Sequence, residues 1–417
     1  MSGRAHIIGA GLSGLSAAVE LARNGISITL YEGASNAGGR CRSFFDSELN
    51  RVIDNGNHLV FSGNYAIFDY LELIGATDKI NIPIPAEILF MDLADRTSWS
   101  IRPDKGSLPW SWLFPQHRVP GTGVIDYLKC WRLMQASDDQ VISDVLPTVG
   151  VLWDKFWEPV ILAVTNTNPK IAAAGPMKRV ILETLAKGER ACRSVFFPEG
   201  LTACLVTPAV NYIKQRGGVV FFNQTVRHIQ TSSNRITALE FGRERIEINK
   251  TDTVIFALPA ATIARLVGGI DVPDAYSPIV NAHFRLPGFI DGPPLLGLVN
   301  SAAEWLFLKK DVVSVTVSAA ETLVRLSSKE LSEMFWRDIQ SAYGLKNMVV
   351  PPNRIVREKR ATILQTPNQL RRRPPCRTHI CNLFLAGDWT ETGLPATIEG
   401  SVRSGLTAAT EACVYMS

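Results

Sequence analysis

Hydrophobic positions open the chain in two different rhythms. Residues 5–9 form a short apolar run, which predicts a buried strand. In residues 12–24 apolar side chains recur at helical spacing, and Gly25 supplies a stop signal for that helix. Residues 27–32 (SITLYE) predict a second strand that ends on an acidic residue. The chain therefore begins with an expected strand–helix–strand unit.

The rest of the chain is less regular, yet its pattern still predicts a succession of helices and strands. The pattern predicts in order a hairpin, a mostly helical region, a single helix, consecutive strands, a group of short strands, and a closing strand, loop and helix. These are expected in residues 86–102, 122–189, 201–216, 219–259, 277–317 and 381–412. No internal repeat or low-complexity segment interrupts this order.

Composition and charge exclude several classes of protein. The 417 residues suffice for two well-buried domains, and 46% hydrophobic with 20% charged residues is ordinary globular composition. A net charge of +4 is too small to indicate a nucleic-acid partner. The basic run of residues 371–373 is interpreted as a solvated loop. Seven cysteines, an odd number without CxxC pairs, indicate neither a disulfide framework nor a metal site, and favour a reducing, cytoplasmic setting.

The apolar N-terminus is not interpreted as a signal peptide. Glu20 and Arg23 fall inside the expected helix, and a glycine-rich turn interrupts the apolar run. No window reaches the roughly 18 uncharged apolar residues of a membrane span. We therefore expect no membrane-spanning segment, although contact with a membrane surface stays open.

The turn in residues 6–25 (HIIGAGLSGLSAAVELARNG) contains G-x-G-x-x-G as Gly9, Gly11 and Gly14. The first glycine permits a tight turn, the second lets the backbone approach a pyrophosphate, and the third allows close helix–strand packing. The helix N-terminus adds free N–H groups and a positive dipole end. Glu32 lies 18 residues past Gly14, where a ribose-binding carboxylate belongs. A dinucleotide-type cofactor is therefore expected here.

Three further stretches favour a flavin over a nicotinamide. In residues 32–43 (EGASNAGGRCRS) a second glycine pair and Arg40 can approach the pyrophosphate of a cofactor bound in extended form. In residues 384–401 (FLAGDWTETGLPATIEGS) Asp388 can accept hydrogen bonds from a polyol chain. The last helix begins there with N–H groups that favour the negative charge of a reduced flavin ring. Residues 51–63 (RVIDNGNHLVFSG) add a strand and a glycine turn.

Together these motifs resemble the FAD-dependent amine oxidase and phytoene desaturase superfamily over essentially the whole chain. The resemblance implies an α/β fold with a Rossmann-type FAD-binding domain of the glutathione-reductase-like kind, interleaved with a mixed α+β substrate domain. It implies a discontinuous FAD domain in residues 1–75, 190–265 and 380–417. The substrate domain would then comprise residues 76–189 and 266–379.

The resemblance also implies roles for individual residues. The first glycine turn would hold the pyrophosphate, Glu32 the adenosine ribose, and Val226 the adenine through its backbone. Gly39 and Arg40 would close over the phosphates, and Asp388 would contact the ribityl chain. The full set of expected FAD-binding residues is Gly9, Ala10, Gly11, Leu12, Ser13, Gly14, Glu32, Gly33, Gly39, Arg40, Gly56, Asn57, His58, Val226, Gly387, Asp388, Thr397, Ile398 and Glu399.

Within the superfamily, residues 156–169 (FWEPVILAVTNTNP), 278–284 (PIVNAHF) and 304–307 (EWLF) resemble the squalene-associated branch. Its members are the bacterial hydroxysqualene dehydroxylases of hopanoid synthesis. The resemblance implies reduction of hydroxysqualene to squalene, with hydride from N5 of reduced FAD and loss of water. A long apolar isoprenoid substrate is therefore expected. No second dinucleotide fingerprint occurs, so electrons would come from an external donor.

Three other functions agree with only part of this pattern or leave it open. Amine oxidases commonly carry a tyrosine where this chain has Thr397, which counts against an amine-binding aromatic cage. A carotenoid or phytoene-type desaturase, or another flavin oxidase of an apolar substrate, stays open. A flavin-free lipid escort protein, such as the Rab GDP-dissociation inhibitors, is disfavoured by the complete flavin motifs.

The dehydroxylation needs an acid near the breaking C–O bond. His58 is the first candidate, because the resemblance places it beside the flavin. Its alternative is a loop histidine bonded to backbone. Glu158 is the second candidate, next to Trp153 and Trp157, with a structural ion pair as the alternative. Asn166 could orient the hydroxyl or simply end a helix.

An aromatic stretch in residues 107–121 (SLPWSWLFPQHRVPG) is too rich in proline for a regular helix. Cationic side chains follow its aromatic ones, as an interfacial anchor requires. We expect a peripheral contact with the inner face of the membrane; burial in the substrate domain is the alternative. The expected anchor residues are Trp110, Trp112, Leu113 and Phe114.

Overall fold

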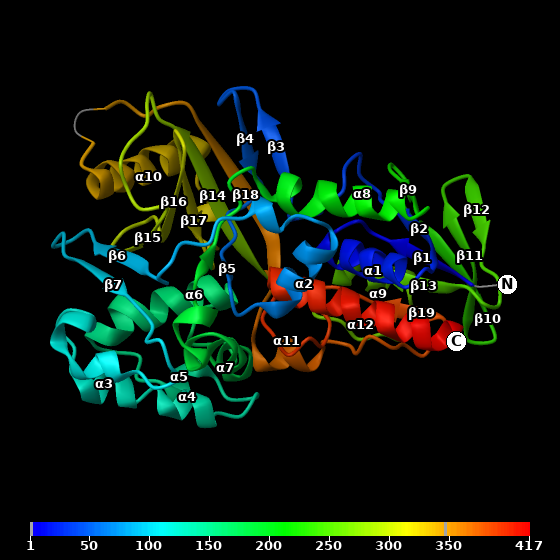
Figure 1. The fold of residues 1–417 in the computed structure, drawn as a ribbon, viewed down its shortest axis with the longest axis horizontal. Coiled ribbons are helices and arrows are strands. Elements are labelled where there is room, and N and C mark those ends of the chain that lie inside the picture. Colours follow the sequence, from blue (N-terminus) through cyan, green and yellow to red (C-terminus); the bar gives the residue numbers. More distant parts are fainter. Residues whose placement is uncertain (1–2, 346–347) are drawn as a thin grey trace.

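Two sheets organise the computed structural model, which describes residues 3–345 and 348–417 (Figure 1). The first is a five-stranded parallel sheet in the order β19-β13-β1-β2-β9. Its strands are β1 (Arg4–Ile8), β2 (Ser27–Tyr31), β9 (Val219–Phe221), β13 (Thr253–Phe256) and β19 (Leu383–Leu385). This doubly covered parallel sheet confirms the predicted Rossmann-type fold. Its strands come from the three segments expected for the FAD domain, whose bounds stay a prediction.

The strands of this sheet carry apolar side chains on both faces, as buried parallel strands do. Ile7, Leu30 and Ile255 share a core cluster with the helices α1 (Leu12–Arg23), α2 (Tyr65–Leu73), α8 (Thr207–Gln215) and α12 (Ile398–Met416). Their neighbours Ile8 and Phe256 belong to the opposite core. That core lies under α9 (Ala260–Leu266) and the meander of β10 (His228–Ser232), β11 (Arg235–Phe241) and β12 (Glu244–Glu247).

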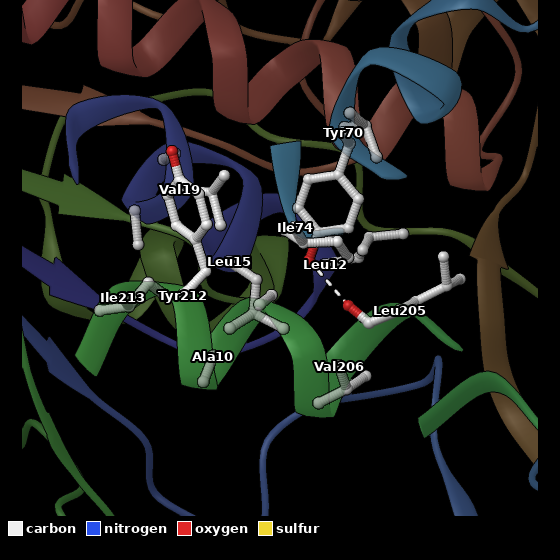
Figure 2. Packing of buried hydrophobic residues seen from close by; sticks show 14 of the residues in the cluster. Ala10, Leu12, Leu15, Val19, Tyr70, Ile74, Leu205, Val206, Tyr212 and Ile213 are labelled. Carbon is white, nitrogen blue, oxygen red and sulfur yellow. Dashed lines mark hydrogen bonds between the residues drawn. The ribbon is translucent and has the colours of Figure 1, made fainter. Parts of the chain in front are cut away.

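The helical side of the first sheet is closely packed (Figure 2). Leu12, Leu15 and Val19 of α1 are buried, which the 3.6-residue period of the sequence predicts. Tyr70 of α2 reaches across and donates a 2.8 Å hydrogen bond to the carbonyl of Leu205, so its hydroxyl is satisfied inside the core. α1 and α12, from opposite ends of the chain, pack side by side in this layer (Figure 1).

The second sheet has seven strands in the order β18-β14-β17-β16-β15-β6-β7. Its strands are β6 (Ile88–Asp92), β7 (Ser98–Ile101), β14 (Tyr276–Arg285), β15 (Leu295–Val299), β16 (Trp305–Lys309), β17 (Val312–Val317) and β18 (Asn353–Ile363). One face packs on α10 (Ser328–Tyr343). The other face meets a layer of short helices: α3 (Val124–Leu128), α4 (Trp131–Gln135), α5 (Ile142–Val145), α6 (Glu158–Thr165) and α7 (Ala174–Glu183).

The remaining strands and helices are short. They include the hairpin β3 (Ser43–Asp46) with β4 (Arg51–Asp54), the pair β5 (Val60–Phe61) with β8 (Ser194–Val195), and α11 (Pro367–Arg371). Single π-helical turns at Trp153–Trp157 and Thr202–Val206 precede α6 and α8. Short 3₁₀ turns occupy Thr77–Lys79, Trp110–Leu113, Pro115–His117, Leu185–Lys187, Glu189–Ala191 and Leu323–Arg325.

Candidate active site

The glycine turn after β1 is shaped for close approach of the backbone. Gly9 has a φ of +103°, and a Cβ at Gly14 would lie 1.9 Å from the carbonyl oxygen of Gly9. A Cβ at Gly11 would meet no heavy atom within 4 Å, so the backbone there borders open space. Leu12 and Ser13 begin α1, where N–H groups lack intrahelical acceptors. The turn can therefore receive an anionic group at a helix N-terminus.

Glu32 follows β2 and holds the first turn in place. Its Oε2 accepts a 2.7 Å hydrogen bond from the N–H of Ala10, and its Oε1 accepts one of 2.8 Å from Ala34. An ionised carboxylate has about four lone-pair sites, so it can still accept bonds from ribose hydroxyls. A Cβ at Gly33 would lie 2.7 Å from Oγ1 of Thr225, so the backbone before Val226 passes close by.

The second glycine pair lies directly against the first turn. The N–H of Gly38 donates to the carbonyl of Ala10 at 2.8 Å, and Gly38 forms a parallel bridge with Gly11. A Cβ at Gly39 would lie 3.3 Å from the Cα of Gly11. A side chain at Gly39 would thus crowd the turn. The two stretches that the sequence assigns to the pyrophosphate therefore form one surface.

Arg40 forms an ion pair with Asp388, which the sequence alone does not predict. Its Nη2 lies 2.6 Å from Oδ1 of the buried Asp388, and its Nη1 donates to the carbonyl of Ala361. The neighbouring Asp388 raises the pKa of Arg40, so the guanidinium stays charged. Arg40 and Asp388, expected at the phosphates and the ribityl chain, thus form an ion pair between β18 and the loop after β19.

Arg373 is buried, which corrects the interpretation of residues 371–373 as a solvated loop. Its guanidinium donates to the carbonyls of Thr390, Leu394 and Asp388, at 2.7, 2.6 and 3.0 Å, and to Oγ1 of Thr392, at 2.7 Å. Burial lowers the pKa of Arg373 to about 10, so it is still charged at neutral pH. Three charges in sequence suggested solvent exposure, but the fold needs one of them to hold the loop that carries Asp388.

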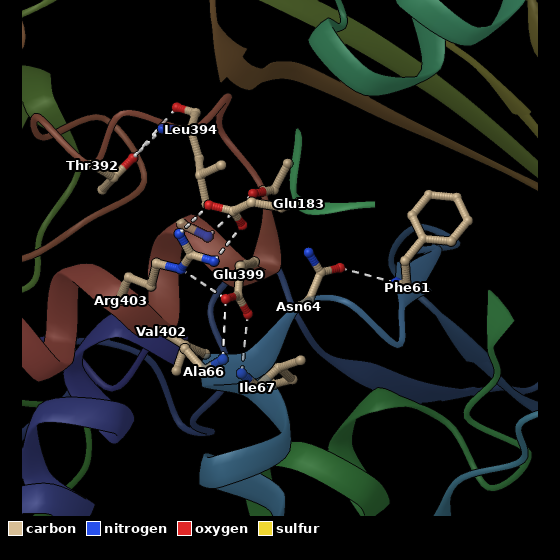
Figure 3. A network of polar contacts seen from close by, with 12 residues as sticks. Phe61, Asn64, Ala66, Ile67, Glu183, Thr392, Leu394, Glu399, Val402 and Arg403 are labelled. Atoms are coloured by element: carbon tan, nitrogen blue, oxygen red, sulfur yellow. Dashed lines mark hydrogen bonds and ion pairs between the residues drawn. The ribbon is translucent and has the colours of Figure 1, made fainter. Parts of the chain in front are cut away.

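The start of α12 is fixed by capping and by a buried ion network (Figure 3). Thr397 is the N-cap, and its Oγ1 accepts a 3.1 Å hydrogen bond from the N–H of Gly400. The Glu399 carboxylate accepts from the N–H groups of Ala66 and Ile67 at 3.1 and 3.0 Å. Arg403 donates to it at 2.7 Å. The side chain of Glu399, expected at the flavin, thus caps α2, which leaves the backbone of residues 397–399 for a cofactor contact.

The loop of residues 55–58 lies against the second sheet. Nδ2 of Asn57 donates to Oγ1 of Thr316 at 3.0 Å, and that hydroxyl donates to Oδ1 of Asn281 at 2.8 Å. A Cβ at Gly56 would lie 3.1 Å from Nδ2 of Asn281. These contacts join the loop expected beside the flavin to the face of β14 and β17 that meets the helical layer.

His58 lies close to the charged groups of this region. Burial lowers its pKa, Asp54 and Asp388 oppose that effect, and Arg40 adds to it. The imidazole is therefore neutral at neutral pH, whereas a proton donor to a leaving hydroxyl needs the imidazolium. The pKa direction counts against His58 as the acid, although its place near Arg40 and Asp388 is where the resemblance puts it.

Asn166 ends α6 and uses its whole amide in doing so. It has a left-handed φ of 48°. Its Nδ2 donates to the carbonyl of Ser277 and to Oγ1 of Thr362, at 3.1 and 2.9 Å, and its Oδ1 accepts from the N–H of Ala319 at 2.7 Å. No donor of the amide is left for a substrate. The geometry favours the alternative of a helix-ending residue.

Glu158 begins α6 and is half-buried, and it acts on a second carboxyl that sequence analysis overlooked. Burial raises the pKa of Glu304 to about 7, and the charge of Glu158 adds to the shift. Oε2 of Glu304 accepts a 2.8 Å hydrogen bond from the N–H of Ser318. Glu304 belongs to the stretch EWLF, which supported the resemblance to the squalene-associated branch. The feature of the sequence that could have indicated it as a site residue is a single acid among apolar residues.

The aromatic stretch of residues 107–121 is largely exposed. Trp110, Leu113 and Phe114 are 63%, 55% and 54% exposed. Trp112 instead turns inward, with its ring 4.7 Å from that of Tyr127, because a 3₁₀ turn points consecutive side chains in different directions. Within the described residues, no helix has the length and apolar character needed to cross a membrane.

Comparison with known proteins gives a consistent family. The model of the family described as flavin containing amine oxidoreductase matches residues 12–413. Proteins named hydroxysqualene dehydroxylase from Sinorhizobium fredii and Zymomonas mobilis are each 42% identical, over 97% of this chain and 97% of their own length. A probable zeta-carotene desaturase from Synechococcus elongatus is 21% identical over 97% of this chain and 98% of its own.

Among solved structures, a putative protoporphyrinogen oxidase from Exiguobacterium matches with a TM-score of 0.72 at 15% identity. The match covers 100% of this chain and 99% of that one, and at this identity it shows a shared fold. The family model covers nearly the whole chain, and the glycine turns, Glu32 and the start of α12 agree with it. The chain therefore belongs to the flavin-containing amine oxidoreductase family, and within it to the group of the hydroxysqualene dehydroxylases.

Proposed function

We propose that this protein is an FAD-dependent oxidoreductase that removes the hydroxyl group of hydroxysqualene and forms squalene and water. The observation that carries the proposal is the 42% identity, over 97% of both chains, to proteins named for this reaction. The desaturase relative is only half as similar, at 21%. The reductive reaction is therefore preferred to desaturation.

The residues present fit FAD. Side chains are excluded at Gly14 and crowded at Gly39, and the backbone at Gly11 borders open space. We propose that these turns hold the pyrophosphate and that Glu32 binds the adenosine ribose. Asp388 and Arg40 would lie along the ribityl and phosphate parts, and the α12 N-terminus would face the flavin ring. Reduced FAD would supply the hydride of this reaction, and an external donor would supply the electrons that reduce FAD.

The protein's own share of the chemistry is to hold an apolar alcohol, to exclude water and to protonate the leaving oxygen. We propose that the face of the second sheet that meets the helical layer takes this role. Phe90, Trp99 and Trp305 pack there as one aromatic cluster. The polar side chains Asn281 and Thr316 lie on the same face, near the loop of residues 55–58.

The deciding experiment uses the purified FAD-loaded protein under anaerobic conditions. The flavin is reduced chemically, hydroxysqualene is added, and the spectrum of oxidised flavin and the squalene yield by mass spectrometry are followed together. The proposal expects flavin reoxidation with one squalene per flavin. If instead oxidised flavin is bleached by a polyene precursor with fewer double bonds and hydroxysqualene is inert, the protein is a desaturase.

We also propose that the exposed end of the helical layer contacts the inner face of the membrane. Besides Trp110, Leu113 and Phe114, the neighbouring α3 and α4 expose Ile125, Leu128 and Trp131, which are 72%, 64% and 64% exposed. Exposed cations border these apolar residues and suit an anionic lipid surface, namely Lys105, Lys129 and Arg132. A long hydrocarbon substrate would enter from lipid without crossing water.

Flotation with anionic phosphatidylglycerol-containing vesicles tests this contact. The variant Trp110→Ser/Phe114→Ser/Trp131→Ser should lose most of its vesicle binding, while the inward-facing Trp112→Ser serves as the matched control. Binding by wild type and Trp112→Ser, but not by the triple variant, supports the contact. Equal flotation of all three, or of none, excludes it.

A further inference from the structure

Glu304 lies where the second sheet meets the helical layer. Its carboxylate accepts the N–H of Ser318, and the next N–H along the chain, that of Ala319, goes to Asn166 at the end of α6. The two side chains are therefore held beside each other by successive residues that follow β17. Glu304 precedes Trp305, whose ring belongs to the aromatic cluster of the helix-facing side.

Two series of hydrogen bonds and adjacent residues link Glu304 with the expected flavin site. On one side, Asn166 donates to Oγ1 of Thr362, and the preceding residue, Ala361, accepts from Arg40. On the other side, Thr316 lies two residues before Ser318 and accepts from Asn57. Two residues of extended chain span about 7 Å. Glu304 is thus linked through Ser318 and Thr316 to Asn57, which is expected beside the cofactor.

Burial, more than any neighbouring charge, favours the protonated form of the Glu304 carboxyl. Burial raises its pKa to about 7, and Glu158 of α6 adds to the shift. The other charged groups on neighbouring elements are engaged elsewhere. Glu321 accepts from Ser277, Asp338 of α10 binds the N–H groups of residues 302 and 303, and Lys155 pairs with Asp92. A carboxyl with a pKa of about 7 is partly protonated at neutral pH, which suits general acid catalysis.

We propose that Glu304, held by the N–H of Ser318 at the end of β17, is the general acid of the dehydroxylation. The carboxyl proton goes to the hydroxyl oxygen of the substrate, the C–O bond breaks, and water leaves. The remaining allylic cation would accept the hydride that the reduced cofactor would supply, and the Glu304 carboxylate would regain a proton from solvent. This assignment rests on the proposed function.

The first test measures flavin reoxidation by hydroxysqualene in a single turnover from pH 5 to 9. The wild-type rate should fall about tenfold per pH unit above about pH 7, as the acid loses its proton. Glu304→Gln keeps an acceptor for Ser318 but carries no acidic proton. It should be about 10²–10⁴-fold slower and lose the fall at high pH. Glu304→Asp should recover part of the rate.

Two further variants separate catalysis from structure. Glu158→Gln removes a charge that raises the pKa of Glu304, so the fall in rate should move to lower pH. Asp338→Asn is the matched control, since Asp338 is also a carboxyl with a raised pKa and supports the same loop from the α10 side. It should leave the pH profile unchanged. A shifted profile in Asp338→Asn, or an unshifted one in Glu158→Gln, would overturn the assignment.

Thermal unfolding gives a readout that does not depend on turnover. Because the folded-state pKa of Glu304 is raised, its contribution to stability is complete below about pH 4.5 and is lost as pH rises through about 7. Glu304→Gln should therefore gain Tm relative to wild type from pH 5 to 9. No relative gain overturns the assignment, as does wild-type squalene formation with an equally fast Glu304→Gln. If wild type forms no squalene, the proposed function itself fails.

Discussion

Replacing Glu399 by alanine should destabilise the protein more than its distance from any reacting atom suggests. The carboxylate is 2% exposed and serves both N–H groups at the start of α2 as well as Arg403 (Figure 3). Asn64, the N-cap of α2, makes no side-chain capping bond, because its Oδ1 accepts from Phe61 instead. Glu399 is therefore the cap of a helix that lies far away in sequence.

The magnitude follows from three lost hydrogen bonds and one lost charge. Removing one partner of a buried ion pair costs about 3–5 kcal/mol, and loss of a helix cap alone costs about 1 kcal/mol. Arg403 keeps Glu183, at 2.9 and 2.5 Å, so its charge is not left unpaired. We therefore expect Glu399→Ala to lower the free energy of unfolding by about 3 kcal/mol, the lower end of that range.

Urea denaturation followed by circular dichroism measures the loss. Glu183→Ala is the matched control: it removes an acid from the same arginine but leaves α2 capped, and a partly exposed pair contributes only about 1 kcal/mol. Equal losses in the two variants, within about 0.5 kcal/mol, would refute the capping argument. FAD affinity measured in parallel should fall only for Glu399→Ala, since α12 carries the backbone expected at the flavin.

Three other changes have defined outcomes. Glu32→Ala should weaken FAD binding about 10–150-fold, from the loss of a charge-assisted bond of about 1.5–3 kcal/mol; the exposed Glu247→Ala should retain full flavin on gel filtration. Asn166→Ala should lose about 2–3 kcal/mol of unfolding free energy through a strained φ and three missing hydrogen bonds, and Asn166→Gly, which relieves the φ, should lose less in the same urea titration. Burial lowers the pKa of His283 to about 4, so the unfolded chain takes up its proton first, and stability should fall by about 3 kcal/mol between pH 6.5 and 4; His283→Gln should flatten that fall, and an unchanged slope would contradict it.

The parts of the site that the sequence predicted well are those set by neighbours along the chain. Gly9, Gly11 and Gly14 act through local backbone geometry, and Glu32 follows them by one helix and one strand. The alternation of buried positions likewise depends on periods of 2 and 3.6 residues. Each of these signals can be recognised without knowing which distant segment will pack beside it.

The remainder depends on contacts between distant segments. Asp388 meets Arg40, which lies 348 residues away, and Glu399 caps a helix more than 330 residues before it. Arg373 and Glu304 acquire their roles only through burial, which depends on the layers around them. The linear sequence does not show which of several possible partners a side chain will meet, and for this reason it points to His58, and not to Glu304, as the acid.

The pairing of α1 with α12 has a consequence for synthesis of the chain. Ser16 of α1 donates to the carbonyl of Val402 in α12, 386 residues later. At about 5–20 residues per second, a ribosome needs roughly 20–80 s to make the intervening chain. During that time the side of α1 that packs on α12 stays uncovered, although α2 and α8 can already pack beside it, and β19 has yet to join the edge of its sheet. Nascent chains should therefore depend on holding chaperones until α12 is available, and FAD should be captured only once α12 and β19 have packed.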